Sequence, residues 1–374
     1  MIFASKRLRS ATVGLGAVIC SFEAGAYEMS PLDAIHEAMT ELAEACLIAS
    51  GGAAPTECAT SGLRTAMGTK GGNRSETQKG TRWPDDPTGM ISISAAAAFV
   101  LQMKGACESN ISSIGTDQTK RNQLGLLCQS HYGDLQFFHA MASQEIEQRE
   151  TTVAKMEDWS RLAFRVATDA TIADTNYCTY FEATTSDLPA IAPSLLGTVD
   201  SSWCKDRPGR YWGIFPITID AWKVQTLFRL TCKNAFSQAT CKEKLSSTGR
   251  KIAVNNSKGA LLHMVQDSYS MSHAHRTISS NNEKDFSPAV RCAPILSFYS
   301  YTKQKRENDK HDAADQFPIF DCETNSNIHD VITASANILY FIEQGTEATD
   351  KKQWEDKLVI YLKEHVIGES PVSN

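Results

Sequence analysis

Residues 259–276 read GALLHMVQDSYSMSHAHR, an apolar run with helical spacing that carries a histidine and an aspartate four positions apart. Residues i and i+4 lie on one face of an α-helix, so His263 and Asp267 can bind one metal ion together. His273 follows six residues later, where serines indicate that the helix ends, and it can meet a second ion nearby. Imidazole and carboxylate are ligands that catalytic zinc prefers. The stretch therefore predicts a helix that ends in a metal site.

A second copy of the spacing occurs at His311-Asp-Ala-Ala-Asp315, after a charged run. Taken alone, a histidine and an aspartate at this spacing are more typical of a solvated helix face than of a metal site. The interpretation of His311 and Asp315 as further metal ligands therefore depends on the motif at residues 263–273.

Apolar residues recur at helical spacing along much of the chain, whereas strand-like alternation is scarce. The expected helices cover residues 32–43, 93–106, 123–149, 153–170, 217–233, 260–272, 328–344 and 351–366. Gly51–Thr81 is rich in Gly, Ser, Thr and Lys and is expected to be a long surface loop. Tyr177–Trp212 is expected to be an ordered excursion. The pattern predicts an all-α fold: a single helical domain over residues 27–374, with loop insertions tied by disulfides.

The first 26 residues have the pattern of a signal peptide. Lys6, Arg7 and Arg9 give a positive start, and the apolar run Ala11–Cys20 is too short to span a bilayer. Ala24–Ala26 then gives the small-residue pattern that signal peptidase recognises. We therefore expect cleavage after residue 26 and a secreted or periplasmic protein.

The cysteines agree with export. Of the 11 cysteines, Cys20 lies in the signal segment, and an even number follows it, which is typical of disulfides in an oxidising compartment. No Cys-x-x-Cys occurs, so a thiolate zinc site is not expected. Many pairings are possible, and the simplest is sequential. That pairing joins Cys46 to Cys58, Cys107 to Cys128, Cys178 to Cys204, Cys232 to Cys241, and Cys292 to Cys322.

Composition excludes several classes of protein. Of the 374 residues, 42% are hydrophobic and 21% are charged, which excludes wholesale disorder. The net charge of -6 offers no basic surface, so no stable complex with nucleic acid is expected. A serine lipase is disfavoured because no Gly-x-Ser-x-Gly motif is present.

The spacing of His263, Asp267 and His273, followed by His311 and Asp315, resembles the core of the zinc-dependent phospholipase C and secreted single-strand nuclease superfamily. The resemblance implies an all-helical fold with two to three zinc ions per chain. It covers most of residues 27–374, but only as scattered motifs. The gaps from Asp85 to His139 and from His273 to His311 are longer than in compact members of the superfamily.

The resemblance also implies four ligands outside the core motif. They are Tyr27 as the new N-terminus, His36 on the first helix, Asp85 in the sequence Trp-Pro-Asp, and His139 at the end of an apolar run. The N-terminal ligand is usually Trp, but its backbone groups are what bind, so Tyr27 can serve in its place. Asp86 remains an alternative to Asp85, and His131 remains an alternative to His139.

The resemblance distributes these residues over three zinc ions. The first would be held by Asp85, His139, His263 and Asp267, the second by His273, His311 and Asp315, and the third by Tyr27, His36 and a shared Asp267. Asp85 would orient or deprotonate the attacking water. Arg276, with His275 beside it, would contact the substrate phosphate, whereas His329 and His365 are interpreted as structural.

The expected function is that of a phospholipase C, which cleaves glycerophospholipids such as phosphatidylcholine to diacylglycerol and a phosphorylated head group. The segment Gln266–His273 is more similar to bacterial secreted phospholipases C than to the fungal nucleases. The protein would be a monomer in transient contact with a membrane surface. The alternatives are a single-strand nuclease or nucleotidase with the same zinc site, and a non-catalytic zinc-stabilised binding protein.

Overall fold

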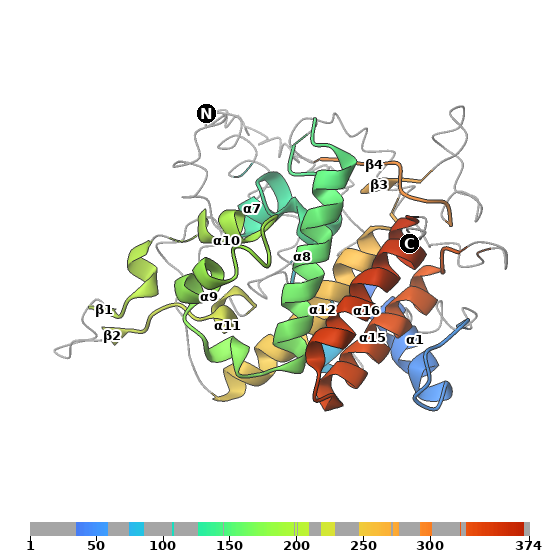
Figure 1. Ribbon diagram of the computed structural model, residues 1–374, viewed down its shortest axis with the longest axis horizontal. Helices are drawn as coiled ribbons and strands as arrows, with labels where there is room; N and C mark the ends of the chain where they lie inside the picture. Colours follow the sequence, from blue (N-terminus) through green and yellow to red (C-terminus); the bar gives the residue numbers. More distant parts are fainter. Residues whose placement is uncertain are drawn as a thin grey trace, which may run out of the picture.

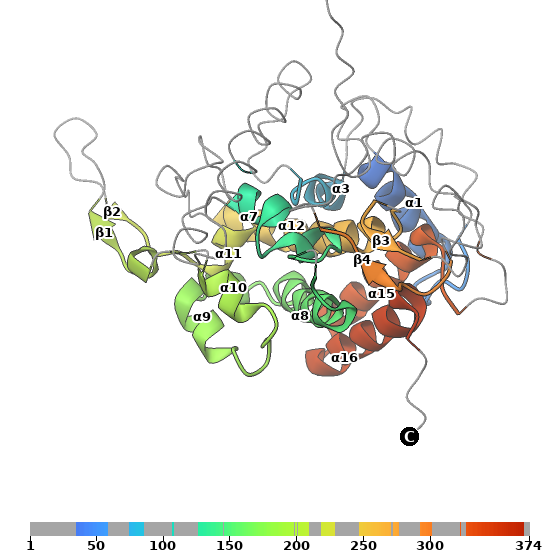
Figure 2. The same ribbon diagram turned by 90° about the horizontal axis from the view of Figure 1, so that it is seen from above.

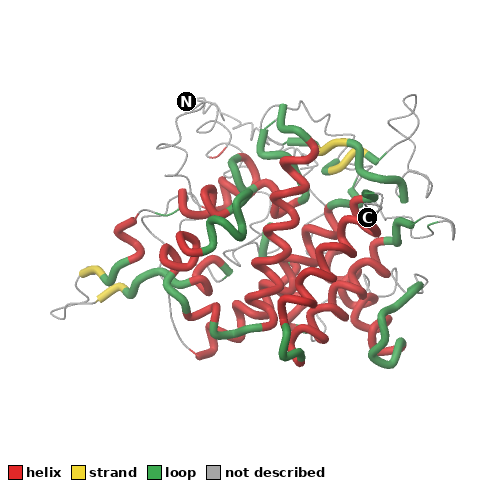
Figure 3. Tube along the Cα trace, in the orientation of Figure 1, coloured by secondary structure: helices red, strands yellow, loops and turns green. Residues whose placement is uncertain are grey.

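The computed structural model describes residues 35–58, 75–85, 107, 126–144, 146–197, 199, 201–208, 218–228, 247–270, 272–276, 292–300, 322 and 327–369. The described part is mostly helical, as the sequence predicted (Figure 3). Two short antiparallel strand pairs complete it. Strand β1 (Arg207–Pro208) pairs with β2 (Thr218–Ile219), and β3 (Ala274–His275) pairs with β4 (Ser297–Phe298).

The helical elements follow one another along the chain (Figure 1). The α-helices are α1 (Ile35–Ala49), α3 (Glu76–Thr81), α7 (Leu126–Tyr132), α8 (Arg149–Thr168), α9 (Tyr177–Ala183), α10 (Ala192–Gly197), α11 (Val224–Leu227), α12 (Ser247–Asp267), α15 (Val331–Glu347) and α16 (Lys351–Tyr361). The shorter turns are η2 (Gln136–His139), η3 (Ile172–Asp174), η4 (Ser201–Cys204) and η6 (Leu362–Ile367), the last of which is π-helical.

Helix α12 lies at the centre of the fold. Figure 2 shows it between α3 on one side and α8 on the other, with α15 also beside it. The apolar residues of its last two turns are fully buried, and so are the polar residues among them, namely His263, Gln266 and Asp267. A helix buried all round belongs to a protein interior rather than to its surface. The predicted metal ligands therefore face other parts of this chain.

Two glycines bring α3 and α12 into backbone contact. A Cβ atom on Gly259 would overlap the backbone of Gly80, and one on Gly80 would overlap the carbonyl of Asn255. Side chains at these positions would hold the helices apart, because interiors are close-packed. The contact places the end of α3 directly against the turn of α12 that carries His263.

Three expectations on local structure need correction. A single helix over residues 123–149 is wrong, because the chain turns at Gly133 and forms α7, η2 and a loop before α8. Ala140 then adopts a left-handed conformation with φ of 49°, which ends η2. The end of the expected loop 51–81 is the helix α3, started by a capping box between Ser75 and Gln78. The expected helix 217–233 is wrong at its start, where strand β2 and a loop precede the short helix α11. The expected helix 93–106 lies outside the described residues.

Four of the predicted disulfides are confirmed. They join Cys46 to Cys58, Cys107 to Cys128, Cys178 to Cys204, and Cys292 to Cys322, whereas Cys232 and Cys241 lie outside the described residues. Four disulfides indicate an oxidising compartment. Among the described residues, no helix is long and apolar enough to cross a membrane. The predicted signal segment 1–26 lies outside them.

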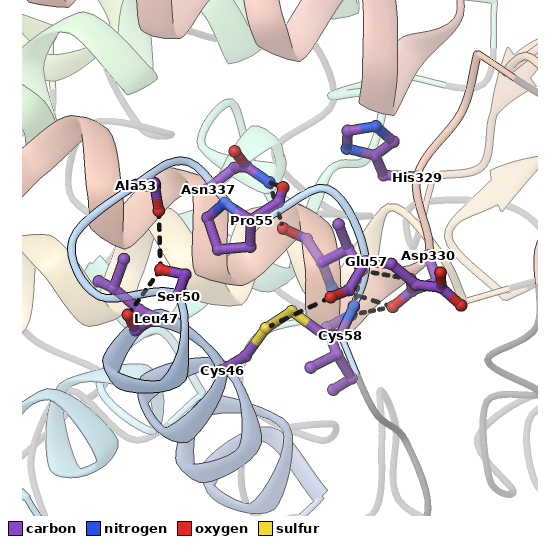
Figure 4. The surroundings of a disulfide bond; sticks show 12 residues. Cys46, Leu47, Ser50, Ala53, Pro55, Glu57, Cys58, His329, Asp330 and Asn337 are labelled. Carbon is purple, nitrogen blue, oxygen red and sulfur yellow. Dashed lines mark hydrogen bonds between the residues drawn. A yellow bond between two sulfur atoms is a disulfide. The ribbon is translucent and has the colours of Figure 1, made fainter.

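The first of these disulfides ties the loop after α1 back to α1, and hydrogen bonds hold the same loop against α15 (Figure 4). The amide of Asn337 donates to the carbonyl of Pro55 at 2.7 Å, and the N–H of Cys58 donates to the Thr333 hydroxyl at 3.0 Å. The covalent bond and these hydrogen bonds act at one place. They fix α1, which carries His36, relative to the core.

His329 and His365 join the C-terminal segment to the start of α15. Their rings stack with centroids 4.6 Å apart, and the Nδ1 atom of His329 lies 2.7 Å from the Tyr361 hydroxyl. The Tyr269 hydroxyl donates to the carbonyl of His329 at 2.7 Å. Burial, together with the neighbouring His365, lowers the pKa of His329 from its ordinary 6.5 to about 4.

We expect this histidine to make folding stability depend on pH. Between pH 6.5 and about 4 the unfolded chain binds a proton that the folded chain resists, so stability is lost as the pH falls through that window. The substitution His329→Gln removes the titrating ring. Its urea-unfolding free energy should fall less between pH 7 and pH 4.5 than that of the unchanged protein. Equal losses in both proteins would contradict the prediction.

Candidate metal centre

The candidate site begins at the last turn of α12. The carbonyl of Thr81 can only accept, so the Nδ1 atom of His263, 2.8 Å away, carries the hydrogen. The Nε2 atom of His263 is therefore the one turned to the other side, 2.9 Å from Asp267 Oδ2, where a metal ion can replace its proton. The i,i+4 pair that the sequence predicted is formed, and a backbone carbonyl from α3 sets its tautomer.

An aromatic cluster positions the next two ligands. The ring of Trp83, two residues before Asp85, packs against the rings of Phe138 and Phe228. The centroid distances are 5.9 Å and 5.5 Å, respectively. Phe138 directly precedes His139 and also stacks on Trp159 at 4.2 Å. Asp85 and His139 are therefore both carried by segments that the same buried rings hold in place.

Four donor atoms from three segments form one group. His139 Nδ1 lies 2.9 Å from His263 Nε2 and 3.0 Å from Asp267 Oδ2. Asp85 Oδ1 lies 3.7 Å from the first of these nitrogens and 3.6 Å from the second. Ligands of a tetrahedral zinc ion, with bonds of about 2.0 to 2.1 Å, are about 3.3 Å from one another. The observed distances lie on both sides of that value, so the group is of the right size for zinc.

A second group shares two of these residues. His36 stacks on His263 with ring centroids 4.1 Å apart, and its Nε2 atom lies 3.4 Å from Asp267 Oδ1. The ligand atoms of these three buried residues lie within 4.8 Å of one another. The two oxygens of Asp267 thus face two different groups, which is the arrangement of a bridging carboxylate.

The electrostatics of the site favour positive charge. Burial raises the pKa of Asp85 to about 6, although His263 and His36 oppose the rise. Burial alone would lower the pKa of His263, but Asp267 and Asp85 outweigh it and raise the value to about 9. Burial would likewise raise the pKa of Asp267, but His263 and His273 hold it well below its ordinary value. The two buried carboxylates are therefore stabilised by a positive charge beside them, which either a protonated histidine or a metal ion can provide.

Two buried polar atoms of the site, His139 Nε2 and Asp267 Oδ1, lack hydrogen-bond partners among the described residues, and Asp267 Oδ1 faces the second group. Leaving such atoms unsatisfied costs about 1–3 kcal/mol each. A cation between His36 and Asp267 would pair the carboxylate oxygen. The imidazole and carboxylate donors of both groups thus fit a divalent cation.

His273 lies at the edge of the first group. Its Nδ1–H donates to the carbonyl of His139 at 2.7 Å, and its own carbonyl accepts the N–H of Tyr299. The ring of His131, the alternative ligand, lies behind His139 with centroids 4.6 Å apart. In this structure His139, rather than His131, lies against the two residues at the end of α12.

Arg276 is placed differently from the expectation. It is fully buried, and its guanidinium donates to the carbonyls of Ser268, Ala293 and Val366 at 2.7 to 2.9 Å. It also lies over the ring of Tyr269, 4.4 Å from the centroid. These contacts tie the segment after His273 to the C-terminal turn. His275, the other expected phosphate contact, belongs to strand β3.

Four predicted residues lie outside the described part of the chain: Tyr27, Asp86, His311 and Asp315. Of the others, the structure brings together the six predicted metal ligands that it describes. They are His36, Asp85, His139, His263, Asp267 and His273. Sequence reasoning missed two residues that contact predicted ligands. The backbone carbonyl of Thr81 accepts from His263, and the side chain of Gln266 contacts the ring of His36. A carbonyl is common to every residue type, so no sequence signal could have singled out Thr81.

Comparison of the chain with protein-family models, with curated proteins and with solved structures found no match. The resemblance to the zinc-dependent phospholipases C and nucleases therefore rests on the motif residues. The site itself is defined by its own geometry: two buried groups of histidines and aspartates that can hold metal ions.

Proposed function

We propose that the protein is a zinc-dependent phosphodiester hydrolase of the phospholipase C type. The observation that carries the proposal is the Asp267 carboxylate, whose two oxygens face two overlapping groups of potential ligands. A shared carboxylate of this kind is suited to holding two metal ions close together. Paired zinc ions, when bound, lower the pKa of a water molecule and polarise phosphoryl oxygens.

The residues of the chain have distinct parts in the proposed reaction. His263, His139 and Asp267 would hold the first metal ion, and His36 would hold another with Asp267. Asp85, whose carboxylate lies beside the first group, would orient the attacking water or accept its proton. The Arg276 guanidinium is directed at the carbonyls of the chain, so the proposal gives it no contact with the phosphate.

Two observations favour a phospholipid over a nucleic acid. The net charge of -6 gives no electrostatic attraction for a polyanion, and the segment Gln266–His273 resembles the secreted phospholipases C. The oxidising compartment that the disulfides indicate is compatible with either substrate, because both kinds of enzyme are secreted.

We expect the purified protein to contain two to three zinc ions and to release phosphocholine from phosphatidylcholine. Elemental analysis would measure the zinc content, and an assay of phosphocholine released from mixed micelles would measure the activity. Single-stranded DNA is the matched second substrate, because a nuclease with the same metals would cleave it instead. Zinc without turnover of either substrate would favour a zinc-stabilised binding protein, and absence of zinc from active protein would overturn the proposal.

A further inference from the structure

A closed chain of hydrogen bonds surrounds His36, on the side away from the candidate metal groups. Its Nδ1 atom lies 2.7 Å from Oε1 of Gln266, and the Nε2 atom of Gln266 donates to the Thr40 hydroxyl at 3.1 Å. The Thr40 hydroxyl donates in turn to the carbonyl of His36 at 2.8 Å. All three residues are buried. The chain of bonds returns to the residue from which it starts.

The direction of each bond follows from Thr40. Its only hydroxyl hydrogen goes to the His36 carbonyl, so towards Gln266 the hydroxyl acts as an acceptor. The NH₂ group of Gln266 must therefore face Thr40, and its Oε1 atom must face the ring of His36. An oxygen at 2.7 Å requires a hydrogen on His36 Nδ1. The other ring nitrogen, Nε2, is thereby the one turned to Asp267, at 3.4 Å.

We infer that Gln266 is the positioning residue that makes His36 a metal ligand through Nε2. The inference rests on the proposed metal-dependent function and deepens it. Gln266 adjoins Asp267 in the sequence, so the last turn of α12 supplies the bridging carboxylate and also the group that orients an imidazole from α1. Residues that hold a ligating imidazole through its other nitrogen commonly strengthen metal binding by about 10- to 100-fold.

The same construction recurs at two neighbouring ligands, which supports this reading. The Nδ1–H of His263 donates to a backbone carbonyl, that of Thr81, and the Nδ1–H of His273 donates to the carbonyl of His139. His36 differs because its acceptor is a side chain. A substitution of Gln266 can therefore remove the acceptor that sets the tautomer of His36. The backbone carbonyls that accept from His263 and His273 cannot be removed by a substitution.

The test uses the mature full-length protein, stripped with a chelator and titrated with Zn²⁺ against a chromophoric competitor. Gln266→Leu removes the acceptor, and the zinc ion held by His36 should bind about 10- to 100-fold more weakly. Gln266→Glu restores an acceptor for the Nδ1–H, so its zinc affinity should stay within a few-fold of the unchanged protein. Thr40→Val frees the amide to turn over and should weaken the same ion, whereas Thr40→Ser should not.

Gln225→Leu is the matched control, because this buried glutamine donates to Asp174 on η3 at 3.0 Å. It should bind zinc normally. Circular dichroism would establish that each variant is folded. Equal zinc affinity in the Gln266→Leu variant and the unchanged protein overturns the inference, as does equal loss with Gln266→Leu and Gln266→Glu. If the unchanged protein binds no zinc, the proposed function itself is overturned.

Discussion

The substitution Asp267→Asn should abolish hydrolysis, with a fall in kcat/KM on the order of 10³-fold or more. An amide keeps the size of the carboxylate but loses the charge that faces both candidate metal groups. Metal ions contribute several kcal/mol to transition-state stabilisation, and each ~1.36 kcal/mol is a factor of ten in rate. His263→Ala should have an effect of the same size, because His263 also belongs to both groups. Zinc content measured on the same samples should fall with activity.

A buried aspartate outside the site provides the matched control. Asp158 on α8 accepts the N–H of Ala190 at 2.7 Å and belongs to neither of the two metal groups. Asp158→Asn keeps an acceptor for that N–H, so its kcat/KM and zinc content should stay near those of the unchanged protein. Near-normal activity of both Asp267→Asn and His263→Ala would show that the end of α12 is structural.

The substitution Gly259→Ala should cost about 3 kcal/mol of stability, although alanine ordinarily stabilises a helix relative to glycine. The added methyl group would overlap the backbone of Gly80, and a backbone cannot turn aside as a side chain can. Overpacking of this kind costs about 1–3 kcal/mol, and here we expect the upper end. Displacing α3 would also move the Thr81 carbonyl away from His263, so zinc affinity should fall about 10-fold or more.

Gly345→Ala on α15 separates the two effects. Its added carbon would meet the ring of Phe164 on α8, away from the metal groups. It should lower the unfolding free energy without changing zinc affinity. Both quantities would be measured by urea unfolding of the metal-free proteins and by zinc competition. Unchanged zinc binding in Gly259→Ala would mean that the contact between α3 and α12 does not support the site.

The sequence predicted the parts of the site that depend on local spacing. His263 and Asp267 share a helix face because of the 3.6-residue repeat, and four sequential disulfides follow from short separations between cysteines. The convergence of His36, Asp85 and His139 on these residues came from the family resemblance. Spacing along the chain holds no information about distances between such remote segments.

The helix boundaries show which signals were passed over. Helix α3 begins with Ser75-Glu-Thr-Gln78, a capping-box sequence that the surrounding polar composition obscured. The break after α7 occurs at Gly133, within a stretch whose apolar periodicity continues on both sides. The spacing of apolar residues indicates which residues are buried, but it does not indicate where a buried segment turns.

The close approach of Gln266 to His36 joins residues that are 230 positions apart in the chain. Contacts between residues so far apart in the chain form late, because closing the long loop between them loses conformational entropy before the contacts stabilise the fold. The centre also needs Asp85 and His139 from two further segments, so a partly folded chain lacks the complete set of donors. If the centre binds metal as proposed, complete binding would therefore follow folding, and the proposed activity would appear only in the fully folded chain.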